Sequence, residues 1–203
     1  MGFNYGLTDK LMIGIGSEKD RKLQDLHWKY TFLQQTRSGS VPVSISYFGN
    51  IALDARSKEN FLTENIEYRY IHRFSYFTQL IVARKFSDAF SFQVAPSFIY
   101  FNAVEQRYNN YNVGLSAGGK IKFSPSWGAT FEYDQAYLKS DTDDAITPEP
   151  NFAIGFEKGT ATHCFQFFLA SYRSIISQYN MAMNQAKFFE GGISLGFNVT
   201  VKF

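Results

Sequence analysis

The sequence predicts an all-β chain that folds as an up-and-down antiparallel transmembrane β-barrel of about twelve strands. Three observations predict this class: an alternation of apolar and polar residues, a regular order of short and long connections, and a second face of mostly small or uncharged polar residues with few charges. The 203 residues are 45% apolar and only 19% charged, with 22 Phe and 13 Tyr. Such a composition favours strands over helices.

The clearest strand is the C-terminal segment GGISLGFNVTVKF, residues 191–203. Its large apolar residues alternate without exception with small or polar ones: Ile193, Leu195, Phe197, Val199, Val201 and Phe203. A period of two predicts a strand with one apolar face. The same alternation recurs at 25–34, 41–53, 90–101, 111–123 and 127–138, with less regular strands at 1–6, 11–19, 70–86, 150–158 and 162–172. About eleven strands are therefore expected in residues 1–203, which we interpret as a single domain.

The connections between these strands alternate in length. Short ones fall at 6–10, 35–40, 86–90, 124–126 and 157–162, and mostly longer ones at 20–24, 54–69, 102–110, 139–149 and 173–187. This order places the tight turns at one end and the long loops at the other, as in an antiparallel meander.

The direction of the strands predicts a missing one. Residues 1–6 run the same way as the last strand, so antiparallel closure needs one more strand before them. That strand would give twelve, an even number usual for bacterial barrels. We therefore expect Met1 to be an internal or misassigned start; the alternative is an imperfect seam.

The composition of the second face separates a membrane barrel from a soluble one. A solvated outer face should carry many Lys and Glu, whereas this face is mostly Gly, Ser, Gln, Asn, Thr and Ala. Aromatic residues lie near strand ends, as in an interfacial girdle: Trp28, Tyr100, Tyr111, Phe123, Trp127 and Tyr137. These features favour an apolar face toward lipid; a soluble lipocalin-like lipid-binding barrel is the alternative.

Charged residues of the second face are expected to line the lumen: Lys29, Lys120, Lys122, Glu132, Asp134, Glu157 and Lys202. The short turn at 124–126 pairs residue numbers that sum to about 250, which puts Lys120 near Thr130 and diagonal to Glu132. Glu132 is therefore the expected ion-pair partner of Lys120. Such a lumen forms either a narrow polar pore or a closed network of salt bridges.

Catalytic chemistry finds little support in the sequence. An outer-membrane lipid-modifying hydrolase would need a Ser beside a His, and His163 with Ser171 or Ser194 is the conceivable pair, although no spacing selects it. Asp141, Asp143 and Asp144 lack the pattern of a calcium loop. We expect no catalytic residue, metal or cofactor, and the net charge of +2 gives no reason to expect nucleic acid.

Two segments carry a resemblance to known barrels. The final strand, ending in Phe203, resembles the insertion signal of bacterial outer-membrane proteins, and YGLTDKLMIGIG (5–16) resembles the first periplasmic hairpin of small outer-membrane barrels. The order of YGLTDKL, VPVSISYFG, QLIVARKFSDAFSFQVAPSFIYFN, HCFQFFLA and GGISLGFNVTVKF resembles a Bacteroidetes-type barrel family of unknown function.

This resemblance implies a location and partners rather than an activity. It implies the bacterial outer membrane, contact with outer-membrane lipids and contact with the barrel-assembly machinery. Other envelope proteins are partners under the anchor alternative. The prediction is a non-enzymatic barrel, either a narrow porin-like channel or a membrane anchor within an envelope complex.

Overall fold

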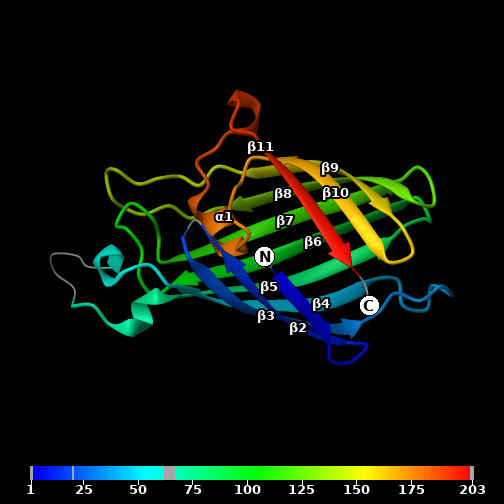
Figure 1. Cartoon of the computed structure of the whole chain (residues 1–203), viewed down its shortest axis with the longest axis horizontal. Helices are drawn as coiled ribbons and strands as arrows, with labels where there is room; N and C mark the ends of the chain where they lie inside the picture. The colour runs from blue at the N-terminus through cyan, green and yellow to red at the C-terminus, as the bar shows by residue number, and fades with distance from the viewer. Residues whose placement is uncertain (1, 20, 62–66, 202–203) are drawn as a thin grey trace.

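The computed structural model describes residues 2–19, 21–61 and 67–201, which form one antiparallel sheet of eleven strands (Figure 1). The strands are β1 (Gly2–Gly6), β2 (Leu11–Glu18), β3 (Leu23–Leu33), β4 (Ser44–Asp54), β5 (Phe74–Lys85), β6 (Phe90–Phe101), β7 (Tyr111–Lys122), β8 (Trp127–Ala136), β9 (Asn151–Gly159), β10 (His163–Ala170) and β11 (Ser194–Val201). Each strand pairs with its neighbours in the sequence. The predicted all-β meander is confirmed.

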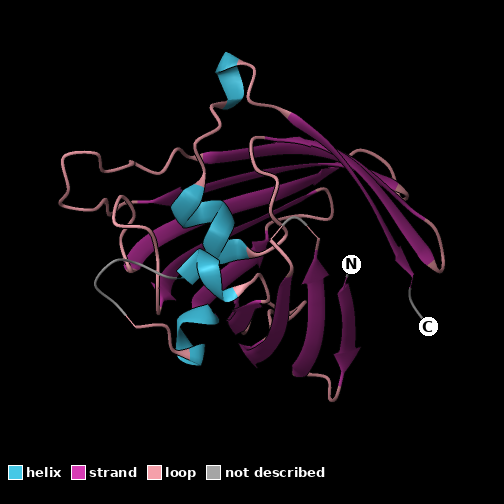
Figure 2. Cartoon of the chain, turned by 60° about the vertical axis from the view of Figure 1, so that its left-hand side comes forward, coloured by secondary structure: helices cyan, strands magenta, loops and turns pink. Residues whose placement is uncertain are grey.

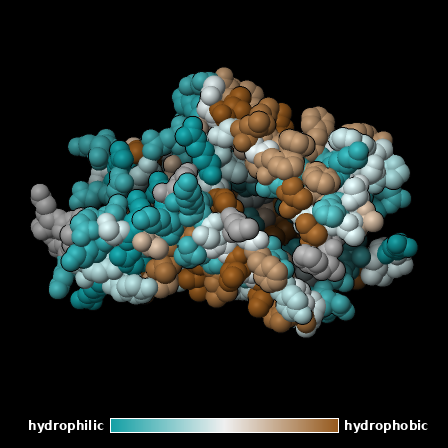
Figure 3. All heavy atoms as spheres, in the orientation of Figure 1, coloured by the Kyte–Doolittle hydropathy of each residue, from teal (hydrophilic) through white to brown (hydrophobic). Residues whose placement is uncertain are grey.

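The apolar face of the sheet points outward. On β9 to β11 the side chains of Ile154, Phe156, Phe167 and Phe197 are each more than half exposed, at 52%, 60%, 57% and 51%. Figure 3 shows apolar atoms over this part of the surface. A soluble barrel would bury these side chains, so the lipocalin-like alternative is wrong and the apolar face is the one a bilayer would cover.

The sheet has two free edges. Among the described residues, β1 pairs only with β2 and β11 only with β10, and the two edge strands stand apart in Figure 2. Free backbone groups at an edge are costly in hydrocarbon, which has no water to satisfy them. Closure of the barrel therefore stays a prediction.

Four short helical segments lie in the long connections: η1 (Lys58–Phe61), η2 (Tyr70–Arg73), α1 (Ser177–Met183) and η3 (Phe188–Glu190). None of the helices in the described part of the chain is both long and apolar enough to span a membrane. The helix α1 lies on the concave side of the sheet (Figure 2). It belongs to the connection between β10 and β11.

The hydrophobic core sits at the loop-side end of the lumen. Ile176, Tyr179, Met181 and Ala182 come from this connection. They pack against wall residues of the inward face: Leu23, Ala52, Phe77, Ile99, Phe101 and Ala136. The sequence predicts only a long polar loop at 173–187, whereas residues 174–185 form a packed segment inside the sheet. We call residues 174–185 the plug.

Candidate functional site

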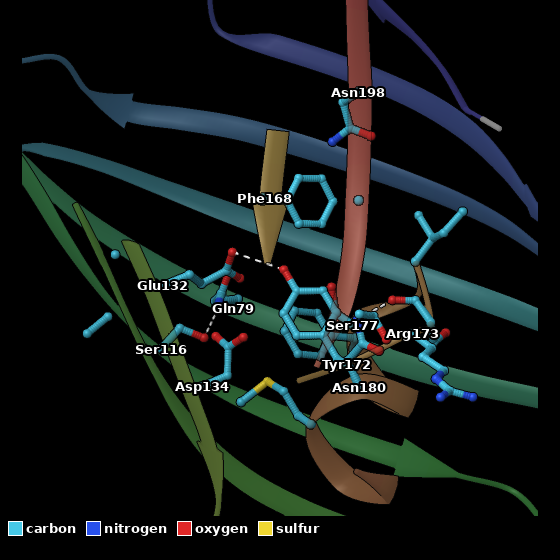
Figure 4. A pocket seen from close by; sticks show the side chains of 18 of the residues that line it. Gln79, Ser116, Glu132, Asp134, Phe168, Tyr172, Arg173, Ser177, Asn180 and Asn198 are labelled. Atoms are coloured by element: carbon cyan, nitrogen blue, oxygen red, sulfur yellow. Dashed lines mark hydrogen bonds between the residues drawn. The ribbon is translucent and has the colours of Figure 1, made fainter. Parts of the chain in front are cut away.

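A cavity of about 620 Å³ lies in the lumen below the plug. Glu132 and Asp134 reach it from β8, and the hydroxyl of Tyr172 donates to Oε2 of Glu132 at 3.3 Å (Figure 4). Burial, and next the charge of Glu132, raise the pKa of the Tyr172 hydroxyl above its usual range. Tyr172 therefore stays protonated and remains a donor to the carboxylate.

The two carboxylates of this cavity have no basic partner. Within the described ranges, no Lys, Arg or His nitrogen lies within salt-bridge distance of Glu132 or Asp134. The side chains of Glu132 and Asp134 are hydrogen-bonded to each other. Ser116 faces Asp134 across the strand pair, and Gln79 Nε2 donates to Ser116 Oγ at 3.0 Å. The middle of the lumen is therefore polar and acidic.

A second cavity, of about 470 Å³, continues the lumen toward the short turns. It shares Gln93, Gly118 and Glu132 with the first cavity, and Lys85 and Lys120 also line it. The two cavities are therefore adjacent. Together they form a hollow that runs from the short-turn end up to the plug.

The register at Lys120 follows the prediction, but its ion pair does not. Lys120 pairs with Thr130 across β7 and β8, and Glu132 is diagonal to it. The ammonium of Lys120 instead contacts the carboxylate of Glu157, on the next strand, β9. The expected partner was therefore wrong: Glu157 faces Gly128, which has no side chain to keep it from Lys120.

The remaining predicted lumen residues occupy different levels. Lys29 lies two residues after His27, on the same inward face of β3, and pairs with Phe48. Lys122 lines a small cavity of about 180 Å³ near the short turns, together with Glu157. Lys202 and Phe203 lie outside the described residues.

Polar contacts at three points tie the plug to the wall. Ser174 Oγ and the Ile175 N–H both donate to Oε2 of Glu18 at 2.6 Å. Gln178, which is fully buried, donates to Asn50 Oδ1 at 2.8 Å and to Ser75 Oγ at 3.2 Å. The third contact is from Asn151 Nδ2 to the carbonyl of Asn180 at 3.0 Å.

The composition of the predicted loop at 173–187 already indicates a packed segment. The stretch SIISQYNMAM, residues 174–183, contains five large apolar residues. A solvated loop of that composition is unusual, because such side chains gain by burial. The wall offered a second signal, since Ile99 and Phe101 place apolar side chains on an otherwise polar face.

A hydrogen-bonded chain links the N-terminal edge to the plug. His27 Nε2 lies 2.6 Å from Asn4 Oδ1, and His27 Nδ1 lies 2.6 Å from Asp25 Oδ2. Asp25 also accepts from Asn50 Nδ2 at 3.0 Å, and Asn50 in turn accepts from Gln178. Because an amide oxygen lies at Nε2, where a hydrolase would place its nucleophile, this Asp–His pair lacks a hydroxyl to activate.

The conceivable hydrolase pair on the outer face is not assembled. His163 is the first residue of β10 and pairs with Val201, whereas Ser171 follows the last residue of that strand. Ser194 pairs with Ala170, at the same far end. A strand length therefore separates His163 from both serines.

Comparison with known proteins adds one decisive finding. A family model described as a membrane-bound beta barrel domain, DUF5777, matches residues 1–203. The chain belongs to this family. A DUF5777 chain with an outward apolar face is a membrane barrel, as predicted.

Other comparisons are more distant. No curated protein matches the chain. Among solved structures it is similar to the outer membrane channel DcaP of Acinetobacter baumannii, with 13% identity and a TM-score of 0.39 over 83% of this chain and 54% of that one. The DUF5777 chain thus spans about half the length of that channel. A likeness this weak carries no argument about function.

The Glu18 contact gives a first testable expectation. Glu18→Ala removes the acceptor of two short hydrogen bonds, and bonds to a charged group contribute roughly 1.5–3 kcal/mol each. We expect the plug to loosen and limited proteolysis to cut within residues 174–185 faster than in the parent. Glu18→Gln keeps an acceptor oxygen and should show a smaller increase. Equal rates of cleavage in all three proteins would show that Glu18 does not hold the plug in place.

Proposed function

We propose that this protein is a non-enzymatic channel of the bacterial outer membrane, narrow in bore and closed at its loop-side end by the plug. The observation that carries the proposal is the polar, hollow lumen that ends at a packed segment. A barrel serving only as an anchor needs no hollow, and its interior charges are best paired. Here Lys120 is paired with Glu157, but Glu132 and Asp134 are not paired with any described basic residue.

The location and partners follow from the same proposal. The outward apolar strands contact outer-membrane lipids, and the C-terminal strand, with Ile193, Leu195, Phe197, Val199, Val201 and Phe203, is the segment that the barrel-assembly machinery reads. Other envelope proteins are expected at the long loops. The resemblance of the final strand to known insertion signals supports this assignment.

Conductance in a planar bilayer tests the channel. We expect the parent protein to show little conductance, because the plug closes the lumen. Replacing residues 174–185 with a Gly–Ser linker should give discrete ion-conducting events, and Glu18→Ala should give rarer ones. Folding of both variants is checked by heat-modifiable migration on gels. If the folded, plug-free protein did not conduct, the channel proposal would be contradicted, and a role as a membrane anchor would explain the barrel better.

The acidic level of the lumen predicts the selectivity of the open state. Glu132 lines both cavities without a basic partner, so a charge at this position acts on ions that pass. Glu132→Lys in the plug-free background should shift the reversal potential in a salt gradient toward anions. Glu105→Lys, in the solvated loop after β6, makes the same charge change away from the lumen. An equal shift in both variants would show that Glu132 does not face the permeation path.

A further inference from the structure

We propose that Lys187–Glu190, which comprises η3 and the residue before it, docks on the lipid of the membrane that holds the barrel. We call these four residues the foot. Phe189 is 84% exposed, more than any other large hydrophobic side chain in the described part of the chain. A ring left in water at that exposure is unfavourable unless something apolar covers it.

The rings of the foot continue the lipid-facing surface of the barrel. Phe188 and Phe189 lie 5.3 Å apart between ring centroids, and both contact Phe152, at 6.1 Å and 5.5 Å. Phe152 in turn lies 5.0 Å from Tyr133. Phe152 and Tyr133 alternate with the inward residues Asn151 and Asp134, so their side chains are on the outer side. The foot is therefore attached to the outside of the wall.

The level of the foot is that of the membrane interface. On β8 the outward residue after Tyr133 is Gln135, whose Oε1 accepts from the Tyr133 hydroxyl at 3.3 Å and whose Nε2 donates to a backbone carbonyl at 2.6 Å. Leu115, which pairs with Gln135, and the 58% exposed Tyr137 also lie on the outer face, so a polar amide and exposed apolar side chains meet at this boundary. Aromatic rings concentrate at this boundary because it offers an apolar side and a wet side.

The foot has the two sides that such a boundary requires. Lys187 Nζ lies 3.2 Å from Glu190 Oε1, so its charged ends are paired beside the two rings. The occupant that fits is lipid at the junction of acyl chains and headgroups, because the apolar surface is continuous with the strands that lipid already covers. A protein partner would need a separate surface, and the rings share theirs with Phe152.

The foot contacts the outer side of the sheet, and the plug contacts its lumenal side. Both belong to the β10–β11 connection: α1 lies on the concave side of the sheet, while η3 stands off from the strands (Figures 1 and 2). Asn184 joins the two halves at the rim, since its backbone carbonyl accepts from the Glu149 N–H at 2.9 Å and its Oδ1 accepts from the Ala186 N–H at 3.0 Å. Lipid under the foot therefore helps to fix the plug.

A spin label reports directly on the surroundings of the foot. Phe189→Cys is labelled with a nitroxide in a Cys164→Ala background, in vesicles of phosphatidylethanolamine and phosphatidylglycerol. Oxygen, which enters lipid, and a water-soluble nickel complex are compared as relaxing agents. We expect oxygen to dominate at 189, as at a lipid-facing label placed by Phe197→Cys. A label placed by Ile175→Cys is the matched control, because Ile175 is exposed at 67% in the same connection but lines the lumen cavity.

The result at position 189 decides the proposal. Nickel accessibility equal to that at 175 would overturn it, whether the ring is then free in water or reserved for a protein. Phe189→Ser tests the link to the plug and leaves the wall residues themselves unchanged. It should raise the rate of proteolysis within 174–185 in vesicles. Neither readout uses conductance, so the docking of the foot stands or falls independently of the proposed channel.

Discussion

Phe197→Arg is expected to prevent stable insertion of the barrel. Phe197 is the fourth residue of β11, its side chain is 51% exposed on the outer face, and its ring lies 4.5 Å from that of Phe167. A cationic side chain at mid-depth on the lipid face costs about 2–4 kcal/mol, falling toward the interfaces. Leu195, the second residue of β11, lies nearer the loop-side end, so Leu195→Arg should cost less. Urea titration in vesicles measures both.

The matched control for Phe197→Arg is Asn198→Arg, one residue further along the same strand. Asn198 lines the lumen cavity, where an arginine can meet water and the acidic residues of β8. We therefore expect Asn198→Arg to insert nearly as well as the parent. If the two arginines had the same effect, the inward and outward faces of β11 would have been assigned wrongly.

The strands were predictable from the sequence because their signal is local. A period of two survives in each strand whatever its neighbours do, and the short turns fix the register, as at Lys120 and Thr130. The outward face was predictable because every side chain that faces the hydrocarbon of the bilayer must be apolar, on each strand alike. Neither inference needs knowledge of long-range packing.

The plug was not predictable by the same reasoning, because no periodicity marks it. Its helix, Ser177–Met183, is short, and it gains its stability from wall residues far away in the sequence. Gln178 meets Asn50 and Ser75, and Ser174 meets Glu18. The ion pair between Lys120 and Glu157 was not predicted for a related reason. A lysine side chain is long enough to reach several partners, and the position of β9 beside β8 decides which one it meets.

Phe101→Ala is expected to give the largest loss of stability among single substitutions in the plug core. Phe101 is 2% exposed and its ring meets that of Tyr179 edge-on, with centroids 5.2 Å apart. Removing a buried Phe leaves a cavity and costs about 3–5 kcal/mol. We expect a lower thermal midpoint, together with faster proteolysis of residues 174–185, because the wall loses the surface on which Tyr179 rests.

The control for Phe101→Ala comes from the other face of the same strand. Phe98 is 45% exposed toward lipid, so Phe98→Ala removes an equal side chain, but acyl chains can fill the space it leaves. Phe98→Ala should therefore lower the thermal midpoint less and leave the cleavage rate of the plug unchanged. The comparison separates general loss of barrel stability from loss of the plug contact. If Phe98→Ala released the plug as readily as Phe101→Ala, the core described at the loop-side end would not be what holds the plug inside the barrel.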